Sequence, residues 1–424
     1  MKEPKLRFKK EDGVQFPDWE EKTFNDVADY KKGPFGSALK KKIFVPKSNN
    51  TVKVYEQQNA ISKDWRLERY FVTDDYFQTK MKSFSVSAGD IIVSCAGTIG
   101  EIYELPSDAE EGIINQALMR VRIKKSVINS MVFKCVFDKM ISSEGIKISN
   151  GSALKNIPPF ADMKKQPVFL PSLPEQQKIA SLFTELDNLI QSAENELEGY
   201  RELKQGMLQK MFPKKGEKVP EIRFPEFTGE WGQRKLSELA TMHARIGWQN
   251  LRTSEFLDTG DYMLITGTDF EEGRVNYSTC HYVEKERYDQ DKNIQIKNGN
   301  ILITKDGTLG KVAYVEGLNM PATLNAGVFN IEVRDENETD GKYLFHFLKA
   351  PFLMDYVARK VAGSTIKHLN QNILVDFPIS MPSKEEQKKI GEYFSNLDNL
   401  IASQQQELDG YKELKKGLLQ QMFC

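Results

Sequence analysis

A segment of 43 residues occurs twice in this chain of 424 residues, and this duplication restricts the possible folds more than any other feature. LPSLPEQQKIASLFTELDNLIQSAENELEGYRELKQGMLQKMF at 170–212 returns as MPSKEEQKKIGEYFSNLDNLIASQQQELDGYKELKKGLLQQMF at 381–423, without a gap and with more than half of its positions identical. Shorter matches keep nearly the same offset, among them Trp19 with Trp231 and the glycine turns GTIG and GTLG. A period of about 210 residues indicates a duplicated domain rather than a solenoid.

Each copy predicts a long helix, because Pro-Ser precedes it as a plausible cap and apolar residues then recur at alternating steps of four and three. We expect the two helices to pack against each other as an antiparallel coiled coil within the chain, although an intermolecular dimerisation arm is the alternative reading of the periodicity alone. Lys204 and Lys415 fall on the seam, where their neighbours Leu203 and Leu414 are expected to fill in. The predicted seam positions are Leu186, Ile190, Leu197, Tyr200, Met207, Leu397, Ile401, Leu408, Tyr411 and Leu418.

The parts before each helix predict β-rich domains of an α+β fold. GDIIVSCAGTIGEIYEL and GNILITKDGTLGKVAYV each indicate two strands joined by a tight glycine turn. MVFKCVFDKMISSEG and GKYLFHFLKAPFLMDYVARK indicate helices that close the two domains. The expected order is therefore a first domain at 1–170, a helix at 171–212, a linker at 213–230, a second domain at 231–380 and a second helix at 381–424.

Composition excludes several classes of protein. We find no apolar run long enough to span a bilayer and no secretory signal in the charged first residues, so we expect a cytoplasmic chain without a membrane partner. The four cysteines and four histidines are scattered without metal-ligand spacing, which predicts neither zinc nor a disulfide framework. The net charge is −1, but residues 1–170 carry 28 Lys+Arg against 22 Asp+Glu. Charge alone is therefore neutral on DNA binding.

The order of these motifs resembles the specificity subunit of type I restriction–modification systems, and the resemblance covers the whole chain. It is carried by the openings LPSLPEQQKI and MPSKEEQKKI, the two LDNLI segments, the two MF endings, the KDGTLG turn (305–310) and the IRFPEFTGEW linker (222–231). Each motif is weak by itself, whereas their order and duplication are specific.

The resemblance implies a non-catalytic, sequence-specific DNA-binding subunit. Each domain would read one half of a bipartite, asymmetric site in double-stranded DNA. The helices would hold the two domains at a set distance and dock two methyltransferase subunits, and a restriction and translocation subunit would join outside. No cofactor is expected on this chain, because S-adenosylmethionine, ATP and magnesium would belong to the partner subunits.

Cations, amides and flexible glycines are the groups that contact phosphates and base edges, and they gather in two matching loops. In each domain the alternative reading is a solvated loop. The candidates in the first domain are Lys31, Lys32, Gly33, Phe35, Ser37, Lys40 and Lys41, together with Gln57, Gln58 and Thr98. Those in the second domain are Arg245, Trp248, Gln249 and Arg252, together with Lys305 and Thr308. Ser152, Lys155, Ser364 and Lys367 are candidate phosphate contacts.

The glycine turns around Thr98 and Thr308 have a second reading as plain hairpin turns that need positive φ, and this reading is favoured. Two other functions stay open as alternatives. A self-contained methyltransferase or nuclease lacks support, because NIPPF at 156–160 splits the asparagine from the prolines and no glycine-rich cofactor loop follows a strand. A coiled-coil scaffold without DNA contact is the other alternative.

Overall fold

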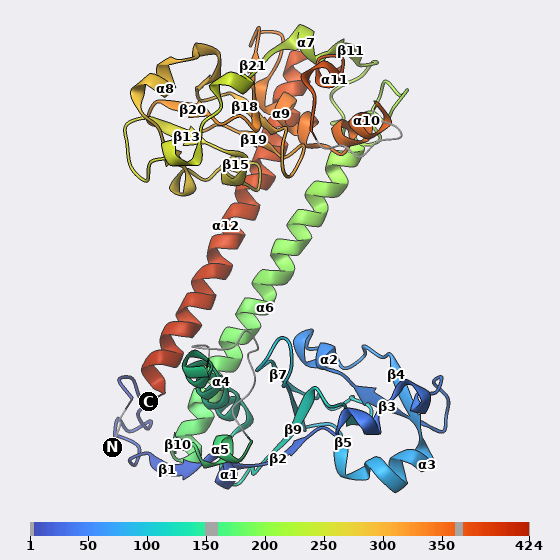
Figure 1. Ribbon diagram of the computed structural model, residues 1–424, viewed down its shortest axis with the longest axis vertical. Helices are drawn as coiled ribbons and strands as arrows, with labels where there is room; N and C mark the ends of the chain where they lie inside the picture. The colour runs from blue at the N-terminus through green and yellow to red at the C-terminus, as the bar shows by residue number, and fades with distance from the viewer. Residues whose placement is uncertain (1–3, 149–159, 361–367, 424) are drawn as a thin grey trace. The chain divides into compact units, whose positions relative to one another are not determined.

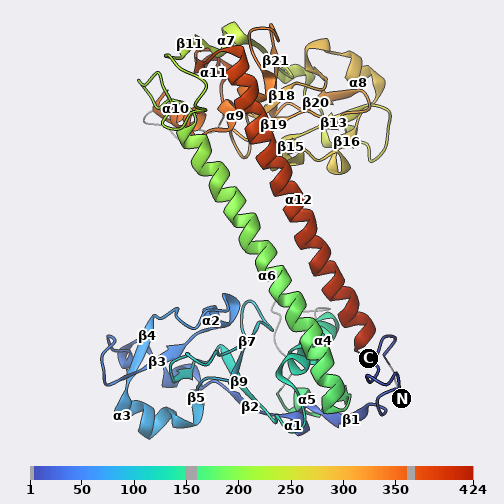
Figure 2. The ribbon, with the colours of Figure 1, turned by 180° about the vertical axis from the view of Figure 1, so that it is seen from behind.

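The computed structural model describes residues 4–148, 160–360 and 368–423, and it divides into two compact units (Figure 1). Unit 1 comprises Met1–Ser192 and Asp409–Cys424, and unit 2 comprises Ala193–Leu408. Helix α6 (Leu173–Lys210) begins in unit 1 and ends in unit 2, whereas α12 (Lys384–Met422) begins in unit 2 and ends in unit 1 (Figure 2). The expected fold class, with β-rich domains and a long helix between them in the chain, is confirmed. None of the described helices is long and apolar enough to cross a membrane.

The strands of unit 1 form one two-stranded and two four-stranded sheets, in the orders β1-β10, β2-β9-β6-β7 and β4-β3-β8-β5. The strands are β1 Glu20–Thr23, β2 Ala28–Lys32, β3 Thr51–Tyr55, β4 Tyr70–Thr73, β5 Ser85–Val86, β6 Ile91–Ser94, β7 Ile102–Glu104, β8 Gly112–Ile114, β9 Leu118–Ile123 and β10 Pro167–Leu170. The helices and helical turns are α1 Phe24–Val27, η1 Gly36–Ala38, η2 Lys41–Ile43, α2 Gln57–Ile61, α3 Asp74–Tyr76, η3 Phe77–Met81, η4 Lys82–Phe84, α4 Ser130–Ile148 and α5 Phe160–Lys165.

The strands of unit 2 form sheets in the orders β11-β22, β12-β21-β18-β19-β15-β14 and β16-β13-β20-β17. The strands are β11 Gly232–Lys235, β12 Ala240–Ala244, β13 Met263–Ile265, β14 Phe270–Glu271, β15 Arg274–Val275, β16 His281–Tyr282, β17 Gln295–Ile296, β18 Ile301–Thr304, β19 Val312–Tyr314, β20 Ala322–Leu324, β21 Val328–Val333 and β22 Pro378–Met381. The helices and helical turns are α7 Leu236–Leu239, η5 Gly247–Gln249, η6 Thr253–Glu255, η7 Gly267–Asp269, η8 Tyr277–Thr279, α8 Lys285–Asp289, η9 Lys292–Ile294, α9 Gly341–Lys349, α10 Phe352–Lys360 and α11 Gln371–Leu374.

The duplication extends from the helices to the sheets. The order β2-β9-β6-β7 in unit 1 matches β12-β21-β18-β19 in unit 2. Each smaller sheet has the same central parallel pair, β3 with β8 and β13 with β20, between antiparallel neighbours. Unit 2 adds the short strands β14 and β15 at the edge of its larger sheet. Two sequences with little similarity therefore fold into the same topology.

Alternation along the central strand builds each domain in layers. Ile91 and Val93 of β6 belong to the core that includes α4 and the start of α6, whereas Ile92 between them faces the smaller sheet. In unit 2, Leu302 of β18 likewise faces away from Ile301 and Ile303. Because successive side chains of a strand point to opposite faces, a run of buried aliphatic residues indicates a sheet that is covered on both sides.

Each long helix ends in the main hydrophobic core of the unit in which the other one begins. In unit 1 the last aromatic residue of the repeat, Phe423, packs against Trp19 and Phe183, with ring centroids 6.1 and 6.0 Å apart. In unit 2 the equivalent Phe212 packs against Phe394 at 5.8 Å. Both phenylalanines are buried. The duplicated MF ending is therefore a core element of each unit.

The Glu-Gln pair at the start of each long helix anchors the segment that precedes the domain. Arg7 donates two hydrogen bonds to Glu175, at 3.1 and 2.9 Å. Arg223 makes the same two-pronged contact with Glu386, at 2.8 Å for both bonds. Both carboxylates are buried, so each needs its arginine to offset the loss of hydration. These glutamates therefore hold the fold together.

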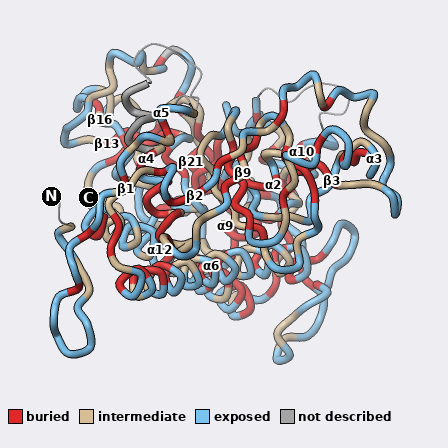
Figure 3. Tube along the Cα trace, turned by 90° about the horizontal axis from the view of Figure 1, so that it is seen from below, coloured by how far each residue is buried: buried red, intermediate tan, exposed pale blue. Residues whose placement is uncertain are grey.

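Buried, half-buried and exposed stretches alternate along α6 and α12 (Figure 3). The predicted seam residues of these helices are buried or half-buried. The buried ones are Leu186, Leu197, Leu397, Ile401 and Leu408, and the half-buried ones are Ile190, Tyr200, Met207, Tyr411 and Leu418. The expectation for Leu203 and Leu414 is wrong, because they are 41% and 50% exposed. One residue advances a helix by about 100°, so the residue before a seam lysine points away from the seam.

The seam lysines form equivalent ion pairs in different surroundings. Lys204 in unit 2 is buried and pairs with Asp398, and Lys349 of α9 lies 3.8 Å from the same carboxylate. His346 is fully buried beside them, with its Nδ1 4.0 Å from Asp398. In unit 1 the equivalent pair, Lys415 with Asp187 at 2.5 Å, is about one-third exposed. The duplication thus supplies a buried pair and an exposed control for it.

We predict that the stability of unit 2 rises with pH above neutrality. Burial first, and then the neighbouring Lys349 ammonium, lowers the pKa of Lys204 to about 7 from the ordinary 10.5. Between these two pKa values the unfolded chain binds more protons than the folded chain. The free energy of unfolding should therefore increase by about 1 kcal/mol for each pH unit as the pH rises from 7. Urea unfolding at pH 7, 8 and 9 measures this slope, and the Lys204→Met variant should lose it. An equal slope in both proteins would contradict the prediction.

Candidate nucleic-acid interface

Two predicted loops of unit 1 meet at one end of the larger sheet. Strands β2 and β6 both pair antiparallel with β9, and both end at its beginning, where Lys32 is opposite Met119 and Ser94 is opposite Leu118. The loop after β2 and the turn after β6 therefore leave the sheet at the same edge. Backbone bonds fix both of them there, from the Gly33 N–H to the Leu118 carbonyl and from the Cys95 N–H to the Ala117 carbonyl.

Unit 2 repeats this edge with different residues. Strands β12 and β18 end opposite Phe329 and Val328 at the start of β21. The Lys305 N–H donates to the Gly327 carbonyl, as Cys95 does to Ala117 in unit 1. The two edges are thus equivalent in backbone structure, and the side chains on them differ.

The first loop is held at its base by backbone contacts and is flanked by lysines. A β-carbon at Gly33 would lie 1.7 Å from the carbonyl oxygen of Asn115, so only glycine fits this close approach. Tyr76 donates its hydroxyl to the Ala38 carbonyl at 2.7 Å and holds the far side of the loop. Lys32, Ser37, Lys40 and Lys41 are exposed, whereas Lys31 lies half-buried over the ring of Phe84. The loop therefore presents cations from a fixed backbone.

The second loop corrects two of the predicted contacts. Arg245 is 2% exposed and donates to the Leu324 carbonyl and to the Thr323 hydroxyl, so its guanidinium is occupied inside the domain. Gln249 is buried as well, and its carbonyl accepts from Arg245 at 3.5 Å. Both residues shape the loop from within, against the expectation that they lie on its reading surface. Arg252 remains exposed.

The other candidates lie around the same two edges. Thr98 is exposed on the turn after β6, and Gln57 reaches this turn, with its Nε2 3.6 Å from the place of a β-carbon on Gly97. Gln58 is exposed, and its side-chain amide donates a hydrogen bond to the Ser62 hydroxyl. Thr308 is exposed on the equivalent turn, and Lys305 lies half-buried over the ring of Phe329. Both turns adopt positive φ at their glycines, 65° at Gly97 and 70° at Gly307, as the hairpin reading predicts.

Some predicted contacts lie outside the described residues. These are Ser152, Lys155, Ser364 and Lys367, and the side chain of Trp248. The sequence pattern also missed one residue that the structure brings forward. Ile246 is 53% exposed at the position that matches Phe35. An alignment of the two loop sequences on Gly36 and Gly247 places Ile246 opposite Phe35 and would have identified this residue.

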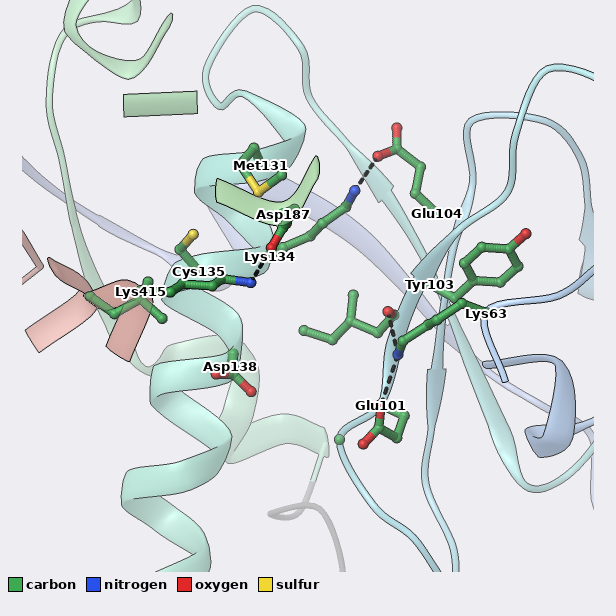
Figure 4. A pocket seen from close by; sticks show the side chains of 13 residues that line it. Lys63, Glu101, Tyr103, Glu104, Met131, Lys134, Cys135, Asp138, Asp187 and Lys415 are labelled. Carbon is green, nitrogen blue, oxygen red and sulfur yellow. Dashed lines mark hydrogen bonds and ion pairs between the residues drawn. The ribbon is translucent and has the colours of Figure 1, made fainter. Parts of the chain in front are cut away.

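A polar pocket of about 520 Å³ lies within unit 1, between the β6–β7 hairpin and helix α4 (Figure 4). Its cations are paired with carboxylates of its own wall, Lys63 with Glu101 and Lys134 with Glu104, each at 2.7 Å. Lys415 pairs with Asp187 on the same wall. Because these charges neutralise one another, the pocket does not have the character of an anion site.

The described residues offer few of the groups that metal or thiol chemistry needs. They contain no cluster of three or more His, Cys, Asp or Glu side chains that could hold a metal ion. Burial raises the pKa of the thiols of Cys95, Cys135 and Cys280 to about 12, which keeps them protonated and poorly nucleophilic. The two exposed loop edges remain as the candidate functional surfaces.

Comparison with known proteins finds relatives in sequence and in fold. The chain is 22% identical to the type I restriction enzyme MjaVIII specificity subunit of Methanocaldococcus jannaschii, over 97% of this chain and 94% of that protein. It has the same identity and coverage with the putative type I restriction enzyme MjaX specificity subunit of that organism. The fold matches the crystal structure of the type I restriction–modification S subunit from M. genitalium, with a TM-score of 0.59, 16% identity and coverage of 100% and 99%.

A second solved structure, described as the structural basis of complex assembly and conformational transition of the type I restriction–modification system, matches with a TM-score of 0.55 and 15% identity, covering 96% of this chain and 98% of that one. The family model of the type I restriction modification DNA specificity domain matches twice, at residues 17–199 and 228–410. The two matched segments make up most of the chain and coincide with the two copies of the duplication. This chain therefore belongs to the type I restriction–modification DNA specificity family.

Proposed function

We propose that this chain is the non-catalytic subunit that selects the DNA target of a type I restriction–modification complex, and that each domain reads one half of a two-part site. The observation that carries the proposal is the repeated sheet edge with unlike loops. Lysines surround the loop after β2, whereas an internal arginine shapes the loop after β12. Two different readers on one duplicated frame suit an asymmetric site, whereas two identical readers suit a palindrome.

The partners follow from the same proposal. Two methyltransferase subunits would dock on α6 and α12 and supply S-adenosylmethionine chemistry, and restriction subunits would bring ATP and magnesium. The exposed face of the helices supports such docking, because Leu189, Leu203, Leu400 and Leu414 are 41–50% exposed at equivalent positions of the two repeats. Solvent-exposed leucines that recur on a helix favour a protein partner.

Sequencing of methylated DNA tests the proposal. Cells that carry the chain together with its methyltransferase subunit should methylate a two-part sequence, and cells that lack either protein should not. Exchange of residues 231–380 for the second domain of another family member should change one half of the sequence and leave the other half intact. Methylation or cleavage by the purified chain alone would overturn the proposal in favour of a self-contained enzyme.

We predict that the lysines of the first loop contribute to DNA affinity through phosphates. The variant Lys40→Gln/Lys41→Gln should weaken binding by the assembled complex and lower the slope of log K against log salt by about one for each phosphate that is no longer neutralised. Fluorescence anisotropy between about 50 and 200 mM salt measures this slope. Lys124→Gln/Lys125→Gln is the matched control, because these lysines follow Ile123 at the opposite end of β9. Equal decreases in affinity for both variants would contradict a role for the loop edge.

A further inference from the structure

Both loops carry an exposed apolar side chain at the equivalent position. Phe35 is 90% exposed, and Ile246 is 53% exposed. Each precedes a single helical turn, η1 or η5, and the two backbones match, with φ −60° and ψ 145° at Phe35 and φ −78° and ψ 147° at Ile246. The backbone carbonyl of each residue accepts a hydrogen bond from the N–H three positions later in the chain. The donors are Ala38 for Phe35, at 2.9 Å, and Gln249 for Ile246, at 2.8 Å. The match is therefore one of local structure as well as of order in the chain.

The two domains reach this arrangement by different means. In unit 1 the residue before Pro34 is a glycine, whose backbone is pressed against the Asn115 carbonyl. In unit 2 the residue before Ile246 is Arg245, whose buried side chain reaches the Leu324 carbonyl at 2.9 Å. The two acceptors lie at the ends of equivalent strands, because Asn115 directly follows β8 and Leu324 is the last residue of β20. Unlike anchors that present an apolar residue at the same place indicate that its exposure serves the loop's function.

The surroundings of Phe35 favour a polyanion over a protein as its partner. Residues 31–43 contain five lysines and no carboxylate. Among residues 20–60, all of which the structure describes, Phe35 is the only large apolar side chain that is fully exposed. Protein interfaces gather apolar side chains and deplete charge at their centre, whereas DNA-binding proteins place single apolar wedges among cations.

We infer that Phe35 and Ile246 contact DNA bases, entering the duplex as apolar wedges while the neighbouring cations hold the phosphates. The inference rests on the proposed function and names the residues through which each loop touches the bases. A planar ring can stack on a base that has lost a neighbour, and an aliphatic side chain can pack on base surfaces or on a thymine methyl group. Neither interaction neutralises a phosphate, so neither should depend on salt.

The test uses the complex of the full chain with its methyltransferase subunit, and a duplex that bears the sequence methylated in cells. Phe35→Ala should lower affinity about tenfold with an unchanged salt slope, since base stacking of ~1–3 kcal/mol corresponds to that range. Phe35→Trp should keep the affinity. Ile246→Ala should lower affinity about threefold, because less apolar surface is then buried against the bases. Thermal unfolding should not change, because the side chains are exposed.

A second readout follows the base stack itself. 2-Aminopurine placed at each position of the half-site that domain 1 specifies should brighten at one position on binding, and Phe35→Ala at saturating concentration should abolish that increase. If Phe35→Ala binds normally while the loop lysine variant binds weakly, the wedge is overturned and the proposed function survives. If neither variant changes binding and the complex shows no salt-dependent affinity for DNA, the proposed function fails. If Phe35→Ala instead releases the methyltransferase subunit, Phe35 is a protein contact and the inference is overturned.

Discussion

Phe423→Ala should destabilise unit 1 by about 3–5 kcal/mol, although the residue lies at the far end of the chain from the domain that it supports. Its ring packs against Trp19 and Phe183 and is 3% exposed. The backbone carbonyl of the same residue accepts from the Lys139 ammonium at 2.7 Å. Removal of the ring leaves a cavity between Trp19 and Phe183, and the surrounding structure relaxes only partly around such a cavity.

Hydrogen exchange under native conditions measures this effect by region. Amides of β2, β6 and β9 should exchange faster in Phe423→Ala, whereas those of β12, β18 and β21 should not change. Phe212→Ala should have the opposite pattern, with faster exchange in unit 2 only, because Phe212 packs against Phe394 and Phe347 in the core of unit 2. Leu414→Ala is the control in α12, the helix that directly precedes Phe423, and its cost should stay below about 0.5 kcal/mol, since the side chain is 50% exposed. A uniform change in exchange across both units would contradict the prediction.

The reciprocal use of helix ends explains why the two repeats stay alike while the sheets diverge. Each repeat must fit the core of the unit in which it starts and also that of the unit in which it ends. Phe183 and Phe423 meet in unit 1 as Phe394 and Phe212 meet in unit 2. A change in one repeat therefore affects two cores. The loop edges carry no such double constraint.

Much of this fold could be predicted because the duplication is long and its helical period is strong. The two helices, the paired strands around each glycine turn and the helices after the sheets all follow from local pattern. The position of Lys204 could be predicted, but its environment could not. Its partner Asp398 lies 194 residues away, and nothing in the sequence shows that α9 would place Lys349 and His346 beside them.

In the candidate site, too, some features follow from the local sequence and others depend on tertiary contacts. In the first loop Lys32, Lys40 and Lys41 are exposed, as a cationic, glycine-containing segment suggests. Arg245 stands in a similar segment and is buried, because the carbonyl of Leu324 and the hydroxyl of Thr323, both in β20 of the smaller sheet, accept hydrogen bonds from its guanidinium. Such acceptors belong to another strand, 78 and 79 residues away, and their arrangement depends on tertiary structure.

Asp398→Ala should cost unit 2 about 3 kcal/mol below pH 7, where Lys204 is charged, since it leaves a buried cation without its carboxylate. Lys204 would lose its ion-pair partner, and Lys349 would lose the same neighbour. His346 cannot share the charge, because burial, together with Lys204 and Lys349, holds its pKa well below the ordinary value. The loss of stability should grow as the pH falls, because more of the Lys204 population must then be charged inside the protein.

The exposed copy of this pair separates burial from charge. Asp187→Ala removes the same interaction, with Lys415, where both side chains are about one-third exposed, so it should cost less than about 1 kcal/mol. The double variant Lys204→Met/Asp398→Leu should return to within about 1 kcal/mol of the parent, because a buried pair replaced by apolar groups also loses its desolvation penalty. Urea unfolding, with hydrogen exchange of α9 and α12 to locate the effect, measures all three. Equal losses of stability for Asp398→Ala and Asp187→Ala would show that the pair in unit 2 is hydrated, and burial would then not be the cause of the lowered pKa of Lys204.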